Sequence, residues 1–169
     1  MKTNKDNSIK RAATIFLQTI IVLVGITVFV ALLVMPQLEG RNKDSTLFQT
    51  YFTDPFLAYV YIASVPFFVA LYQAFKGLGY IRQNTVFSAS AVKTLRTIKY
   101  CALVIAGSTI AADIYIRVTA QSSHDDSAGA IMLGIVITFV SLVVAAIAAV
   151  FENILRGAVD IKSENDLTV

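Results

Sequence analysis

The chain has 169 residues, of which 56% are hydrophobic and 15% are charged, and its formal net charge is +3. Most of the hydrophobic residues lie in four long apolar segments, so they predict lipid-facing surface and not one oversized soluble core. Four such segments leave room only for short loops and tails, which excludes a separate soluble domain. The cations are expected at membrane borders, a distribution that argues against direct binding of nucleic acid.

The apolar segments cover residues 12–35, 55–75, 98–120 and 129–151, and residues 152–169 form a tail. A helix needs about 20 mostly apolar residues to cross ~30 Å of hydrocarbon, and each segment is long enough. We therefore expect an all-α fold, a four-helix bundle that forms one integral membrane domain. The first segment is too long for a signal peptide and lacks a cleavage site, so we expect it to be retained.

The basic residues predict the orientation, because short cytoplasmic loops of membrane proteins are enriched in Lys and Arg. The N-terminal tail, the loop between the second and third segments and the C-terminal tail hold Lys2, Lys5, Lys10, Arg11, Lys76, Arg82, Lys93, Arg96, Lys99, Arg156 and Lys162. The other side holds only Arg41, Lys43 and Arg117. We expect a multi-pass protein of the bacterial cytoplasmic (inner) membrane with both termini in the cytoplasm.

The loop before the third segment has the pattern of an amphipathic helix. Ser88 is suited to cap a helix over residues 89–99, with Lys93, Arg96 and Lys99 on one face and apolar residues on another. We expect this short cytoplasmic helix to lie along the inner headgroups and to lead into the third segment. It is interpreted either as a basic membrane-border helix or as a docking site for an anionic lipid or a protein partner.

Small and weakly polar residues recur at helical spacing in all four segments. In lipid, such residues mark the faces on which helices meet, because they allow close approach and interhelical hydrogen bonds. They predict a compact bundle or, alternatively, a polar path along its axis. The residues are Thr14, Gln18 and Gly25; Ala63, Pro66, Ala70, Gln73 and Gly77; Ala102, Ala106, Thr109, Asp113, Arg117 and Ala120; and Gly134, Thr138, Ser141, Ala145, Ala148 and Glu152.

The polar face of the third segment is a candidate ligand or proton site, formed by Thr109, Asp113 and Arg117. A charge in hydrocarbon is costly, and Asp113 lies only about one turn outward of the middle of its segment. Asp113 and Arg117, four residues apart, are spaced to neutralise each other as a helical ion pair. The alternative is that Asp113 is protonatable or binds a cationic or hydroxyl-bearing ligand.

The tail alternates charged and apolar residues from Glu152 to Asp166, which predicts that the fourth helix continues past the membrane. We expect Asn165 and Asp166 to turn the chain, so that the acidic residues Glu164 and Asp166 meet the basic face of the loop helix. The other possibility is that the C-terminal residues add to the edge of a partner's sheet.

The sequence offers no catalytic constellation. No nucleophile paired with a base is visible, and the lone histidine, His124, is expected in an outer loop. The single cysteine, Cys101, permits no internal disulfide or thiolate metal cluster. His124, Asp125 and Asp126 are adjacent in one short loop and make a poor metal cage. We expect no cofactor, no metal and no enzymatic activity.

Two stretches carry a family resemblance. Val86-Phe87-Ser88, continued by the block from Val92 to Cys101, and the tail from Ile161 to Val169 resemble recurring blocks of a bacterial family of small four-span membrane proteins, domain of unknown function 2975. That family has no established activity and offers no functional residues to carry over. Its members are often encoded beside small helix-turn-helix regulators, so the resemblance implies a regulatory or sensing role.

Together these features predict a non-catalytic membrane protein that acts through a partner at its cytoplasmic face, as a sensor, regulator or accessory subunit. The parts expected to bind the partner are the loop helix and the acidic tail. The alternative is a small transporter or ligand-binding bundle that uses Asp113. The bilayer is the partner expected in either case, and homo-oligomerisation stays open.

Overall fold

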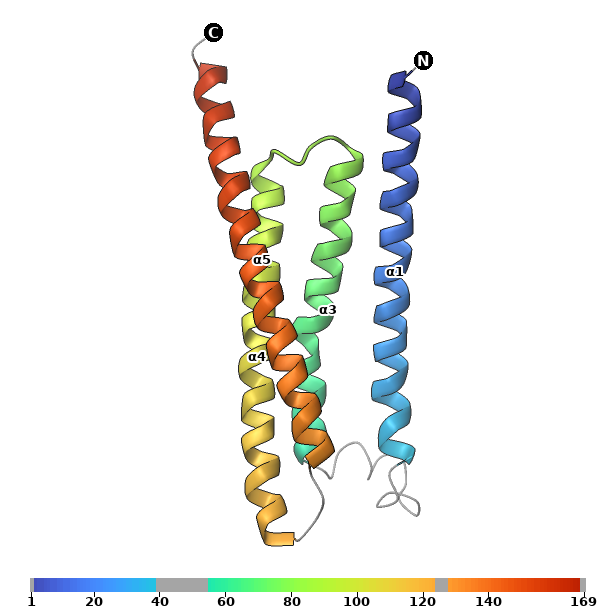
Figure 1. Cartoon of the computed structure of the whole chain (residues 1–169), viewed down its shortest axis with the longest axis vertical. Helices are drawn as coiled ribbons and strands as arrows, with labels where there is room; N and C mark the ends of the chain where they lie inside the picture. Colours follow the sequence, from blue (N-terminus) through green and yellow to red (C-terminus); the bar gives the residue numbers. More distant parts are fainter. Residues whose placement is uncertain (1, 39–54, 124–127, 168–169) are drawn as a thin grey trace.

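Figure 1 shows a computed structural model of the chain, which describes residues 2–38, 55–123 and 128–167. They form four helices: α1 (Lys2–Leu38), α3 (Pro55–Arg82), α4 (Ala89–Ser123) and α5 (Ala128–Leu167). All four are long and apolar enough to cross a membrane, which confirms the expected spans. The described residues contain no strand, as expected for an all-α fold.

The helices alternate in direction. The N-terminal end of α1, the connection between α3 and α4, and the C-terminal end of α5 lie at the same end of the molecule (Figure 1). We call this the basic end, formed by residues 2–11, 76–99 and 152–167. Both α1 and α5 reach beyond the α3–α4 connection there (Figure 1). With 40 residues, α5 is about 60 Å long, roughly twice the thickness of the hydrocarbon.

The α3–α4 connection is short and defined by hydrogen bonds. Asn84 adopts a positive φ of 55°. The amide of Thr85 donates to the carbonyl of Tyr80 at 2.9 Å, and the amide of Asn84 donates to that of Ile81 at 3.2 Å. These bonds satisfy the last carbonyl groups of α3 in the Schellman pattern. The helix therefore ends at Arg82.

The amphipathic segment at residues 89–99 is not a separate helix. Ser88 caps it as expected, since its Oγ accepts a hydrogen bond from the amide of Ala91 at 3.3 Å. The segment then continues without a break as the first turns of α4. Its residues Ala91 and Val92 are buried in a cluster with Leu155 of α5. Because this face packs inside the protein, the segment cannot also lie flat along the headgroups.

The four helices pack in chain order. α1 packs on α3, α3 on α4 and α4 on α5, and the contact between α4 and α5 is the most extensive. None of the large side chains in the described part is fully buried. The expected compact bundle is therefore a serial arrangement, in which each helix is held mainly by its neighbours in sequence.

Small residues form the α4–α5 seam, as their spacing predicts. Ala102 and Ala106 of α4 are 3% and 2% exposed, and Ala145 and Ala148 of α5 are both 4% exposed. Between helices in lipid, close van der Waals contact replaces the hydrophobic effect as the source of attraction. Alanine brings the two backbones close, so this seam is the firmest contact of the fold.

Side-chain hydrogen bonds hold α3 between its neighbours. The hydroxyl of Tyr61 donates to the carbonyl of Leu32 in α1 at 2.8 Å, and that of Tyr59 donates to the carbonyl of Ser108 in α4 at 2.6 Å. Gln18 of α1 donates through Nε2 to the carbonyl of Phe75 at 3.3 Å. Gln18 of the predicted α1 face thus contacts α3, whereas Gln73 and Gly77 of the predicted α3 face lie against Thr94 of α4.

We predict that Ala106→Leu destabilises the protein by about 1–3 kcal/mol, because the added side chain has no space in the seam. Thermal unfolding in a mild detergent measures the effect. The matched control is Val104→Leu, which enlarges a 54% exposed position on the same helix. Equal melting temperatures for the two variants would show that the seam is not closely packed.

Candidate functional site

Two groups of polar residues lie along the α4–α5 seam, one at the basic end and one towards the opposite end. The first is centred on Glu152, whose side chain is 5% exposed. Arg96 donates through Nε to its Oε1 at 2.7 Å, and Lys99 donates through Nζ to its Oε2 at 2.6 Å. Each carboxylate oxygen therefore has its own cationic donor. We call these three residues the Glu152 clamp.

The Glu152 clamp marks the border of the apolar part of the seam. No charged residue occurs between the start of α5 and Glu152. A buried carboxylate is costly unless it is paired, whereas Arg96 and Lys99 keep 42% and 22% of their side chains exposed. The cations can thus reach water or headgroups while the acid is enclosed. The clamp joins α4 to α5 where the helices leave the charge-free region.

The clamp changes the expected role of the basic residues. Arg96 and Lys99 were expected to meet the acidic tail, but they bind Glu152 from within the bundle. The expected turn at Asn165 and Asp166 is wrong, because α5 continues as a helix through both. Glu164 is exposed on that helix, three turns beyond Glu152, and Lys93 is exposed on α4. The side chains of Asn165 and Asp166 lie outside the described part of the structure.

The sequence indicated which helix faces carry the residues of the clamp, but not which of these residues pair across the seam. Glu152 continues the line of small residues on α5, so its burial at the seam follows from the same spacing. Arg96 and Lys99, three residues apart, lie on one side of α4. What periodicity could not supply is the register between the two helices, which places these particular side chains opposite each other.

The second polar group surrounds Asp113, a half-buried residue of α4. Its carboxylate lies directly against the backbone of Gly134 in α5. A Cβ atom added at Gly134 would collide with Oδ1 of Asp113, closer than any real Cβ contact. Glycine at this position is therefore what lets the carboxylate sit between the helices. The neighbouring groove on the protein surface has a volume of about 460 Å³ and is lined by both Asp113 and Arg117.

The expected ion pair between Asp113 and Arg117, both described in the structure, is not formed. Arg117 is exposed at the outer part of the groove. Thr109 donates its hydroxyl to the carbonyl of Ile105 at 2.8 Å, the usual bond of a helical threonine, and does not line the groove. Thr138 was not singled out as a site residue. It lines the groove, and its buried Oγ1 has no hydrogen-bond partner in the structure.

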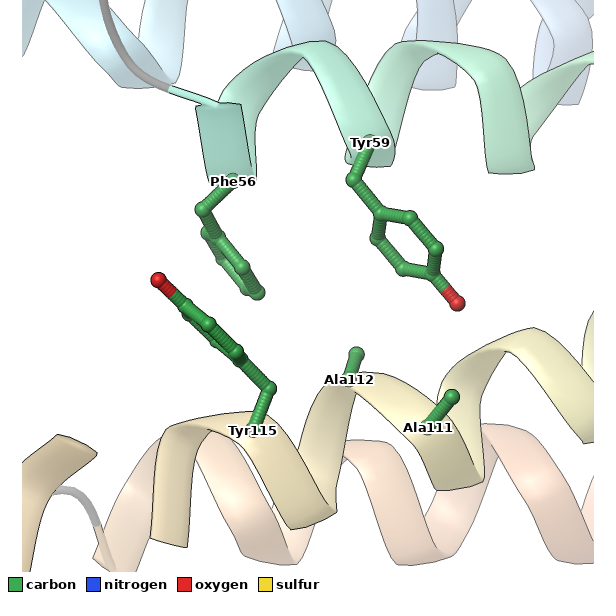
Figure 2. A pocket seen from close by; sticks show the side chains of 5 residues that line it. All are labelled: Phe56, Tyr59, Ala111, Ala112 and Tyr115. Atoms are coloured by element: carbon green, nitrogen blue, oxygen red, sulfur yellow. The ribbon is translucent and has the colours of Figure 1, made fainter. Parts of the chain in front are cut away.

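A smaller cavity lies between α3 and α4 (Figure 2). It has a volume of about 160 Å³ and is lined by Phe56, Tyr59, Ala111, Ala112 and Tyr115. Figure 2 shows that the rings of Phe56 and Tyr115 lie face to face. Their centroids are 5.6 Å apart. Aromatic stacking and the Tyr59 hydrogen bond account for this region as helix packing.

A third feature is an open groove at the basic end, between the α3–α4 connection and α5. It has a volume of about 690 Å³ and is lined by Asn84, Thr85, Phe87, Ser88, Ala158, Ile161 and Lys162. Two of these are large apolar side chains that are mostly exposed: Phe87 at 59% and Ile161 at 64%. We call it the end groove.

The described residues contain no group of three or more His, Cys, Asp or Glu side chains that could hold a metal ion. His124, Asp125 and Asp126 lie outside the described residues. Cys101 is a free cysteine, partly buried within α4.

Comparison with known proteins gives a family and a relative. The model of the family "Protein of unknown function (DUF2975)" matches residues 45–169. The chain is 42% identical over 161 residues to "Uncharacterized membrane protein YoaS" of Bacillus subtilis (strain 168), a match that covers 94% of this chain and 99% of that protein. No solved structure matches the chain significantly.

We predict that Glu152→Met lowers the melting temperature by roughly 5 °C or more, because it leaves Arg96 and Lys99 without their counter-ion at the seam. Thermal unfolding in detergent measures the loss. The matched control is Glu164→Met, an exposed acid on the same helix, which we expect to have little effect because exposed charges add little to stability.

The triple variant Arg96→Met, Lys99→Met and Glu152→Met separates the effect of charge pairing in the clamp from the effect of side-chain packing. Replacing all partners by apolar side chains removes the unpaired charges, so most of the lost stability should return. A triple variant as unstable as Glu152→Met alone would show that packing, and not charge pairing, explains the loss.

Proposed function

We propose that this chain, which belongs to the DUF2975 family of proteins of unknown function, is a non-catalytic membrane protein that acts through a protein partner at its cytoplasmic face. In this proposal it serves as a sensor, regulator or accessory subunit. The proposed contact surface is the end groove, together with the part of α5 that projects past it.

The observation that carries the proposal is the exposure of Phe87 and Ile161 at the basic end. Exposed apolar residues are expected where helices face lipid. These two lie beyond the Glu152 clamp, among Asn84, Thr85 and Lys162. An exposed apolar patch rimmed by polar residues is typical of a protein interaction site.

The surroundings of the end groove also favour a partner. Its two walls are joined by the cluster of Ala91, Val92 and Leu155, against which Val86 and Val159 pack. The Glu152 clamp lies about one helical turn from this cluster, on the side away from the end groove. A preformed surface loses little conformational entropy on binding, which favours association with a second protein.

The proposal includes the orientation with both termini in the cytoplasm of a bacterium. It is supported by the excess of Lys and Arg at the basic end and by the position of both terminal helix ends there (Figure 1). The same face would then be available to cytoplasmic proteins.

Site-specific crosslinking tests the proposed partner surface. A photoreactive amino acid at Phe87 or Ile161, introduced into the full chain in native membranes, should give a discrete crosslinked protein that recurs from both positions. Leu133 is the matched control, because it is similarly exposed (61%) but lies in the charge-free part of α5. The proposal fails if Phe87 and Ile161 give only the lipid adducts expected at Leu133.

Cysteine labelling tests the orientation. In a Cys101→Ala background, a cysteine at Ser163 should react with a membrane-impermeant maleimide only after the cells are permeabilised. A cysteine at Ser45 should react in intact cells, because the first loop is proposed to lie outside. The reverse pattern would place the basic end outside and end the proposal of a cytoplasmic partner.

A further inference from the structure

Asp113 is the only charged residue in the central part of the four spans. The described helices hold no other between Ala12 and Leu38, between Pro55 and Phe75, between Tyr100 and Ile116, or between Ala128 and Phe151. Its carboxylate has no ion-pair or hydrogen-bond partner within the described part of the chain. An unpaired charge at this depth is costly, so the site favours a cation as a counter-ion to the carboxylate.

The carboxylate is held in place by the fold. It lies against Gly134, where even one added methyl group would collide with it. Its contact with the α5 backbone places it at the seam and at the groove described above. Because glycine has no side chain, the carboxylate fits against the α5 backbone here. The alanines of the seam similarly allow the backbones of α4 and α5 to come close.

A second polar group lies in the same groove. Three other threonines of these helices, Thr19, Thr97 and Thr109, donate their hydroxyls to the carbonyl four residues earlier. This bond satisfies a hydroxyl in an apolar setting. The hydroxyl of Thr138, one turn along α5 from Gly134, is buried and makes no such bond. Its oxygen has no hydrogen-bond partner in the protein, and the side chain is part of the groove lining.

The walls of the groove are apolar and open to the side. They consist of Ile110, Ile114, Ile131, Ile135, Phe139 and Leu142. α3 packs on a different face of α4, which carries Ser108, Ala111 and Ala112. The groove therefore opens on the surface that faces lipid, and not into a channel between the helices. A ligand would enter it from the bilayer.

We propose that this groove binds a lipophilic primary amine in its ammonium form. The ammonium group donates hydrogen bonds to the carboxylate of Asp113 and to Oγ1 of Thr138, and its apolar chain lies among the isoleucines. The cation neutralises Asp113, the one acid in the apolar central part of the spans. Arg117, at the outer end of the groove, is exposed and can extend towards headgroup phosphates, which leaves the carboxylate for the ligand. This inference does not depend on a cytoplasmic partner.

A fluorescent amine tests the proposal. The probe is dansyl-1,10-diaminodecane, which has one free ammonium group, and the full chain is placed in nanodiscs of phosphatidylcholine. Fluorescence anisotropy, with empty nanodiscs subtracted, should show saturable binding with one probe per chain. N-decyl dansylamide, which lacks the amine, should partition without saturation.

Variants connect the binding to the proposed atoms. Asp113→Asn should weaken binding by about tenfold or more, and Thr138→Val by about threefold to tenfold, as expected for a charged and a neutral acceptor. Asp160→Asn, an exposed acid on α5, is the matched control and should bind normally. Gly134→Ala should also weaken binding, because it displaces the carboxylate.

The outcomes are decisive in both directions. Equal binding by the original chain and Asp113→Asn, or binding that never saturates above empty nanodiscs, would overturn the proposal. If Asp113→Asn does not fold, as judged by size-exclusion chromatography, the Thr138→Val variant decides. Unchanged affinity in that variant would then reject the site, and a loss of affinity at normal melting temperature would support it.

Discussion

The close approach of α4 to α5 determines where the polar side chains of this protein lie and how its firmest contact forms. Four alanines on the seam leave no side-chain bulk between the two backbones. Both polar groups on the seam are placed by that approach. Glu152 reaches both Arg96 and Lys99 only because the helices are close, and Asp113 touches the opposite backbone for the same reason.

The two polar groups on the seam differ because of where they lie. Glu152 is at the basic end, where its cationic partners remain partly exposed, so the protein supplies both signs of charge and the group is satisfied. Asp113 lies among apolar residues, and the described chain supplies no counter-ion. The first arrangement is explained by stability alone. In the second, Gly134 makes room for the carboxylate without pairing it.

Outside the α4–α5 seam the helices are held less firmly, and the protein has two different kinds of surface. α1 is held mainly by α3, and much of its surface is exposed and apolar, as suits a helix in contact with lipid. At the basic end, the α3–α4 connection and the projecting part of α5 enclose a groove with exposed Phe87 and Ile161. The protein thus has an apolar surface suited to the bilayer and, at the basic end, an open groove that we propose as the partner surface.

The lipid surroundings of the helices, the number of spans and the faces on which helices meet follow from the sequence alone. Length and hydropathy set the spans, and spacings of three and four residues placed Ala102, Ala106, Ala145 and Ala148 correctly. The alternation of charged and apolar residues also indicated that the fourth helix continues past the membrane. These properties are local or periodic, so they can be obtained from a single chain without knowing what lies beside it.

Which polar residues meet depends instead on the packing of the helices in three dimensions. From spacing, Asp113 was expected to pair with Arg117 and the loop cations with the acidic tail. In the structure, Asp113 lies against Gly134 instead, and the cations Arg96 and Lys99 bind Glu152. The physical reason is the register of α4 against α5: sliding one helix by a single turn leaves every periodic pattern intact but changes each partner across the seam. Periodicity fixes a face, whereas close packing of the alanines fixes the position along it.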